Sequence, residues 1–135
     1  MAKINCTVNV QVTDGPKMSL TTTTDVEAYD KIDVTVVKNA VDTKVQLQPG
    51  GAGQVQFLMI TADKYDPSLT YTVNVAAGGG GGGGPPVVPL DGPHILMGKG
   101  GVSLLDDAPT DLFFTNADPN ADAKVHVLLG RDATP

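Results

Sequence analysis

A run of seven glycines, Gly78 to Gly84, followed at once by Pro85, Pro86 and Pro89, constrains the fold of this chain more than any other feature. Glycine loses the most conformational freedom on ordering, and proline has no N–H to donate to a sheet. The run therefore predicts a connector and not a regular element. A flexible segment of this length spans about 15 Å, enough to cross a packed sandwich whose sheets lie about 10 Å apart.

The connector, residues 78–89, separates a main segment, residues 1–77, from a second segment, residues 90–135. The whole chain of 135 residues has the length of one domain. The second segment alone would be too short to build a stable core. We therefore expect a single β domain, in which the second segment packs on the first or on a neighbouring subunit.

Apolar and polar residues alternate along much of the chain. In the first strand Ile4, Cys6, Val8 and Val10 alternate with polar residues, which predicts one face in the core and one in water. Further strands are expected at residues 18–24, 32–37, 44–48, 55–61, 69–75, 94–97, 102–105, 112–115 and 124–129. Residues 14–16, Asp-Gly-Pro, predict a turn, and residues 25–31 are the one candidate for a short helical turn. About ten short strands predict an all-β sandwich of jelly-roll-like form.

The charge and cysteine content exclude several classes of partner. The net charge is −6 and there is no basic stripe, so the sequence predicts no nucleic-acid partner. Cys6 is the single cysteine, and its place in an alternating strand predicts a small buried core residue. No apolar leader and no stretch of membrane-spanning length is present, which predicts synthesis in the cytoplasm and no membrane partner.

One loop has oxygen ligands at alternating positions. Asp118, Asn120 and Asp122 match the first half of an EF-hand loop. Ala123 and Leu129 stand where that loop requires glycine and a bidentate glutamate. The sequence leaves two interpretations, a polar hairpin loop and a weak Ca²⁺ site, and it predicts no cofactor.

No arrangement of residues suggests catalysis. His94 and His126 have no Cys or Glu at ligand spacing, and each is expected to be an ordinary strand residue. Residues 98–101, Gly-Lys-Gly-Gly, lack the spacing of a phosphate loop and predict a hairpin turn. Asp106 and Asp107 are expected to cap a turn. We therefore expect a protein that is not an enzyme.

Aromatic residues are scarce, and two of them are adjacent. In a strand, Phe113 and Phe114 must point to opposite faces. Either both faces are covered within the fold, or one phenylalanine covers an interface between subunits. Phe113, Phe114 and Phe57, which lies in the most apolar strand, are the candidate interface residues.

Two stretches share the order strand, turn, strand. Residues 45–50 lead into the apolar residues 57–60, and residues 112–116 are followed by residues 125–132. Together with the Thr/Val/Gly-rich, cysteine-poor composition, this pattern resembles small β-structured proteins of tailed-phage particles, especially capsid decoration (cement) proteins. The resemblance covers most of the chain, although the glycine run departs from a compact cement protein. It carries over no functional residue.

The resemblance implies a structural role within a virion. We expect a homo-oligomeric, non-enzymatic protein that binds the outside of a phage head and stabilises it, with the major capsid protein or other virion proteins as partners. A minor tail or fibre-associated virion protein is the first alternative. A glycan-binding β-module is the second, although such modules usually stack sugars on exposed Trp or Tyr, and this chain has no Trp.

Overall fold

The computed structural model describes residues 2–47, 54–76, 86–106 and 109–132. Within them lie the strands β1 (Ala2–Gln11), β2 (Lys17–Val26), β3 (Ala28–Val36), β4 (Thr43–Gln46), β5 (Val55–Ala62), β6 (Leu69–Val73), β7 (Val88–Pro89), β8 (His94–Met97), β9 (Asp111–Asn116) and β10 (Ala123–Arg131), and one short helix, α1 (Gly98–Val102). The prediction of an all-β fold with about ten strands is confirmed. The glycine run and residues 48–53 lie outside the described residues. The prediction that the connector holds no regular element is wrong at its described end, where Val88 and Pro89 form β7 and pair with β6.

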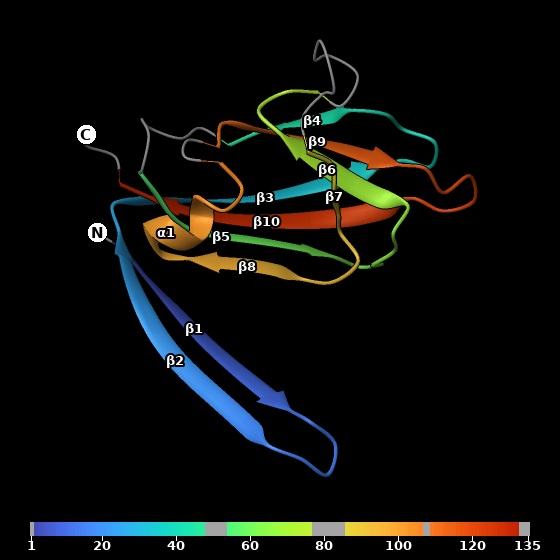
Figure 1. Cartoon of the computed structure of the whole chain (residues 1–135). Helices are drawn as coiled ribbons and strands as arrows, with labels where there is room; N and C mark the ends of the chain where they lie inside the picture. The colour runs from blue at the N-terminus through green and yellow to red at the C-terminus, as the bar shows by residue number, and fades with distance from the viewer. Residues whose placement is uncertain (1, 48–53, 77–85, 107–108, 133–135) are drawn as a thin grey trace.

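Eight of the strands form a two-layer sandwich (Figure 1). One sheet has the order β3-β10-β5-β8 and the other the order β4-β9-β6-β7, with every neighbouring pair antiparallel. The pairing is nested, because β3 lies beside β10, β4 beside β9, β5 beside β8 and β6 beside β7. A long antiparallel hairpin that is rolled up in this way is a jelly roll. The jelly-roll-like sandwich expected from the sequence is therefore present.

Strands from both sides of the connector alternate within each sheet. β10 lies between β3 and β5, and β9 lies between β4 and β6. Each strand of the second segment thus pairs with a strand of the main segment inside the same chain. The two segments share one core and do not form separate layers.

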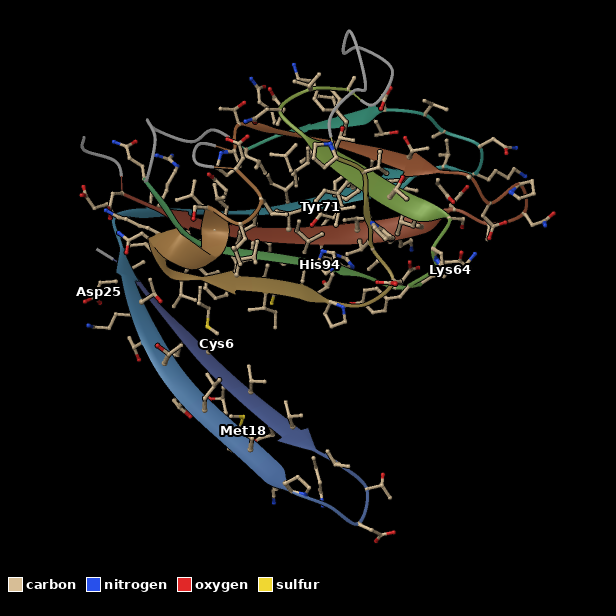
Figure 2. All side chains as sticks on the ribbon, viewed as in Figure 1. Cys6, Met18, Asp25, Lys64, Tyr71 and His94 are labelled. Atoms are coloured by element: carbon tan, nitrogen blue, oxygen red, sulfur yellow. The ribbon has the colours of Figure 1, made fainter. Side chains whose placement is uncertain are left out.

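The core lies between the two sheets. Its inward-facing side chains come from alternate positions of the central strands, as in Val125, Val127 and Leu129 of β10. Tyr71 of β6 packs against Phe114 of β9, with ring centroids 5.5 Å apart, and both side chains are buried. The Tyr71 hydroxyl also reaches His94 of β8, at 2.7 Å from Nδ1, so this side chain links the two sheets (Figure 2).

The remaining two strands form a hairpin, β1-β2, that projects away from the sandwich (Figure 1). We call it the arm. The predicted turn at residues 14–16 closes it: Asp14 has a positive φ of 59°, and the Val12 N–H donates to the Pro16 carbonyl at 2.9 Å. The expectation that the first strand places one face in the sandwich core is wrong, because the eight other strands complete both sheets without it.

Two local predictions are also wrong. Residues 25–31 form no helical turn, since β2 ends at Val26 and β3 begins at Ala28. The Glu27 N–H donates instead to the Arg131 carbonyl at 3.0 Å, so pairing with a distant strand replaces local helical bonds. The second error is at residues 98–105, where α1 and a turn replace the predicted hairpin turn and strand. Gly98, with φ of 78°, turns the chain out of β8, and Val102 is buried.

Candidate functional site

The arm has one polar face, on which side chains of β1 contact side chains of β2. Four cross-strand contacts run along it: Lys3 with Asp25, Asn5 with Thr23, Thr7 with Thr21 and Asn9 with Ser19. These residues are direct partners in the strand register. Asp25, on this face, points away from the sandwich (Figure 2). The polar face therefore satisfies its own hydrogen bonds and stays in water.

The opposite face of the arm is apolar and carries no charged side chain. It consists of Ala2, Ile4, Cys6, Val8 and Val10 on β1, paired with Val26, Thr24, Thr22, Leu20 and Met18 on β2. Exposure increases from the base to the tip of the arm, reaching 54% for Val10 and 70% for Met18. Contiguous exposed apolar surface of this kind marks an interaction site.

The arm is anchored at its base on the outer face of the β3-β10-β5-β8 sheet. Ile4 and Val26 lie over Gly130 of β10, where a Cβ atom would come within 2.6 Å of Ile4 Cδ1 and 2.9 Å of Val26 Cγ1. Glycine is required here because the arm approaches the backbone so closely. Since a strand alternates its faces and Gly130 pairs with Phe57, the Phe57 side chain lies on this same outer face.

A hollow of about 490 Å³ opens in the angle between the arm and the sheet. Its lining comes from the first residues of β1 and from Tyr29 and Leu128 on the outer face of the sheet. Tyr29 is 59% exposed. The outer face continues with Met59 and Leu128, which are half-buried, and with the exposed Ile95. The apolar face of the arm and this part of the sheet thus form the two sides of one open angle.

The three candidate interface phenylalanines lie in different surroundings. Phe114 is fully buried in the core, and Phe57 is 2% exposed near the base of the arm, so neither is available to a second subunit. Phe114 faces the core between the two sheets, and Phe57 lies on the outer face beside Gly130, where the base of the arm packs. Phe113 is half-buried on the outer face of the other sheet and is the one candidate that a partner can reach.

The three oxygen residues of the candidate Ca²⁺ loop do not converge. Asp118 binds Lys64 and accepts a hydrogen bond from the Asn120 N–H, whereas Asp122 accepts one from the Lys38 N–H at 2.9 Å. Lys64 lowers the pKa of Asp118, and Asp118 in turn raises the pKa of Lys64. Across the described residues, no group of three or more His, Cys, Asp or Glu is placed to hold a metal ion.

The two histidines lie in strands and contact single partners. His94 contacts Tyr71, and burial raises the pKa of Tyr71 well above its usual 10.0. His126 lies opposite Asp33 on β3, with His126 Nδ1 2.6 Å from Asp33 Oδ1. This hydrogen bond and a second one from Lys31 lower the pKa of Asp33.

Cys6 is half-buried on the apolar face of the arm and not in the core, which corrects the prediction for this residue. Asp107 lies outside the described residues, so the prediction for the Asp106–Asp107 pair concerns a segment described only in part. No helix in the described part of the chain has the length and apolar character needed to cross a membrane.

Comparison with known proteins finds no family model, no curated protein and no solved structure that matches this chain. The functional argument therefore rests on the site itself. Sequence reasoning found the alternating pattern of β1 but missed the arm as a surface. One available signal was the β2 pattern, in which Met18 and Leu20 lie among polar residues with too few apolar neighbours to fill a core position.

Proposed function

We propose that this chain is a non-enzymatic structural protein of a virus particle, a decoration (cement) protein that binds the outside of a phage head and stabilises it. The observation that carries the proposal is a jelly roll from which an arm with an uncovered apolar face projects. Jelly-roll sandwiches build viral capsid proteins, but they also occur in lectins and cupins. The fold supports the proposal by analogy, and the arm supports it by its chemistry.

The interior of the sandwich argues against an enzyme of the cupin type. Such enzymes need polar ligands pointing between the sheets, whereas the described interior is filled by aliphatic and aromatic side chains. The buried polar residues among the described ones are few, namely Gln54, Thr72 and Asn116. The Tyr71 hydroxyl and the half-buried His94 add one polar contact between the sheets. Asn116 donates hydrogen bonds to two backbone carbonyls, those of Val36 and Ala121. Its role in the fold is structural, and this supports a protein that acts through its surface.

The proposed mechanism is contact with the major capsid protein and with neighbouring copies, through apolar strand faces and exposed strand edges. Each contact can be weak, because many identical contacts on a symmetric shell add up by multivalency. An apolar arm fits this role since it extends contact beyond the footprint of the sandwich. The net charge of −6 keeps the free protein soluble before it binds.

A glycan-binding module is the second candidate, and Tyr29 favours it. This aromatic ring is 59% exposed beside the hollow at the base of the arm. A tyrosine in this position can stack on a sugar ring. Screening against a glycan array, with Tyr29→Ala as the matched variant, tests this function: binding that the variant loses would favour the glycan module over the virion role.

Quantitative mass spectrometry of density-purified particles, from the culture that produces this chain, tests the virion role. The measurement is the number of copies per major capsid subunit. A copy number comparable to that of the capsid protein supports decoration of the head. A few copies per particle would place the protein in the tail or at a vertex, and its absence from particles would overturn the proposal.

A further inference from the structure

The arm is incomplete as an isolated element. A two-stranded hairpin is marginally stable in water, and it needs a third strand or a packed face to persist. The polar face of the arm has its own hydrogen bonds, and the base rests on Gly130. Beyond the base, the apolar side chains of Val8, Val10, Met18 and Leu20 have no comparable cover, with Leu20 42% exposed.

We propose that a second copy of this chain covers this face, and that two arms pack against each other through their apolar faces about a two-fold axis. An antiparallel hairpin has local two-fold symmetry, so the pairs Val8–Leu20 and Val10–Met18 present similar side chains from both strands. An isologous contact needs such a self-complementary surface. The two arms would then form a small sandwich, with their strands in layers about 10 Å apart.

Charge limits where two copies can meet. Each chain carries a net charge of −6, so two sandwiches repel each other at short distance. The apolar face of the arm has no charged side chain between Ala2 and Val10 or between Met18 and Thr24. Ten residues per strand extend the arm by about 33 Å, several times the screening length of about 8 Å at physiological salt. Contact at the arms therefore avoids most of the repulsion.

The size of the surface predicts how strong the contact is. A two-stranded ribbon about 33 Å long and about 10 Å wide has a footprint of about 330 Å², or about 660 Å² for a pair of arms. The area available to a partner is smaller than this, because the base of each arm rests on its own sheet. Stable interfaces bury about 1,200–2,000 Å². The arm contact alone is therefore a weak, concentration-dependent dimer. Such a contact becomes strong where many copies are held side by side, as the proposed virion role requires.

Sedimentation velocity of the purified full chain, from about 10 μM to about 1 mM, measures this association. Val10→Glu places a charge on the apolar face, and Gln11→Glu places the same charge on the polar face, one residue away and opposite Lys17. We expect Val10→Glu to weaken dimerisation by at least about tenfold and Gln11→Glu to change it by less than about twofold. Both positions are exposed and far from the core, so the sandwich is expected to fold in each variant.

The single cysteine gives a second readout without any mutation. Cys6 lies on the apolar face, so packing of two arms would cover its thiol. The alkylation rate of Cys6 is expected to fall with rising protein concentration in the wild type and in Gln11→Glu, but not in Val10→Glu. A wild-type protein that remains monomeric at about 1 mM overturns the inference, and so does equal weakening by both variants. The face would then be available to a different protein.

This inference deepens the proposed function, because it names the surface through which copies meet. Its test uses the purified protein alone and measures self-association. The particle analysis measures copy number. Failure of the arm contact is therefore distinguishable from failure of the virion role.

Discussion

Gly130 and Ile4 are in such close contact that a Cβ atom on Gly130 would lie 2.6 Å from Ile4 Cδ1. This contact holds the base of the arm on the outer face of the sheet. Because Ile4 belongs to β1 and Gly130 to β10, the contact joins the two most distant strands of the chain. This contact and others of the fold lead to five predictions.

Gly130→Ala should destabilise the protein by about 1–3 kcal/mol, because the added methyl group overpacks the base of the arm and displaces Ile4 and Val26. Denaturant unfolding measures the difference. Gly92→Ala is the matched control, since a Cβ atom there meets nothing within 4 Å. Equal unfolding midpoints for the two variants would mean that the arm moves aside freely.

Asn116→Asp should cost about 3 kcal/mol or more, because the side-chain amide of Asn116 donates to the Val36 and Ala121 carbonyls at 3.0 and 2.9 Å. A carboxylate would place negative charge against both acceptors in a site that is 2% exposed. Asn120→Asp, on the exposed part of the same loop, is the control. The free energy of unfolding decides: similar values for both variants contradict the structural role of Asn116.

Tyr71→Phe should lower the free energy of unfolding by about 1–2 kcal/mol, because it leaves Nδ1 of the half-buried His94 without the hydroxyl that contacts it. Tyr65→Phe is the control, since Tyr65 is 38% exposed and its ring is not in the core. Thermal or urea unfolding of both variants at pH 7 measures the effect. A Tyr71→Phe protein as stable as Tyr65→Phe would show that the contact between the sheets contributes nothing.

Tyr71 also predicts how stability changes at alkaline pH. Burial raises the pKa of the folded Tyr71 above its usual 10.0, so the folded state keeps a proton that the unfolded state loses. Stability should therefore be fully present below pH 10 and should fall as the pH rises above it. Comparing the wild type with Tyr71→Phe between pH 9 and 11.5, about the accessible range, isolates this contribution. A pH-independent difference between the two proteins would contradict it.

The lowered pKa of Asp118 predicts a loss of stability in acid, whereas the raised pKa of Tyr71 predicts a loss in alkali. Lys64 and the Asn120 N–H lower the pKa of the folded Asp118 below its usual 3.8, so the stabilisation is present above that value and is lost as the pH falls through the lowered pKa. Asp118→Asn should therefore be less stable than the wild type at pH 7, with a gap that narrows in acid. Urea unfolding midpoints of the wild type and Asp118→Asn, measured from pH 7 down into acid, give the difference in stability. Asp14→Asn, at the tip of the arm, is the control. A constant gap would show that the charge of Asp118 is irrelevant.

Period-two patterning was sufficient to predict the fold class and most strands. It succeeded for β10 and β9 because their inward residues, such as Val127 and Phe114, alternate with outward ones. It could not predict that β1 would leave the sandwich, because alternation shows that a strand has two faces but not what covers the apolar one. The arm is visible only once eight other strands close the two sheets.

Long-range pairing explains the other errors. The local sequence around Glu27 predicted a helical turn. It could not show that the Glu27 N–H donates to the carbonyl of Arg131, which lies far along the sequence. The glycines around Gly98 predicted a hairpin turn. The helix α1 forms there instead and buries Val102, and this burial depends on the tertiary fold, which the local sequence does not show. In the candidate Ca²⁺ loop, the sequence shows the spacing of Asp118, Asn120 and Asp122. It does not show that Asp118 forms an ion pair with Lys64.

The nested pairing of the jelly roll also determines when the protein can fold. β10 is a central strand of its sheet, and its two neighbours, β3 and β5, cannot join without it. Ala28 must therefore find Arg131 across nearly the whole described sequence before that sheet exists. Topologies dominated by such distant pairings fold in about milliseconds to seconds. During synthesis on the ribosome, β3 and the β10-facing edge of β5 must wait for β10 to emerge before they can pair.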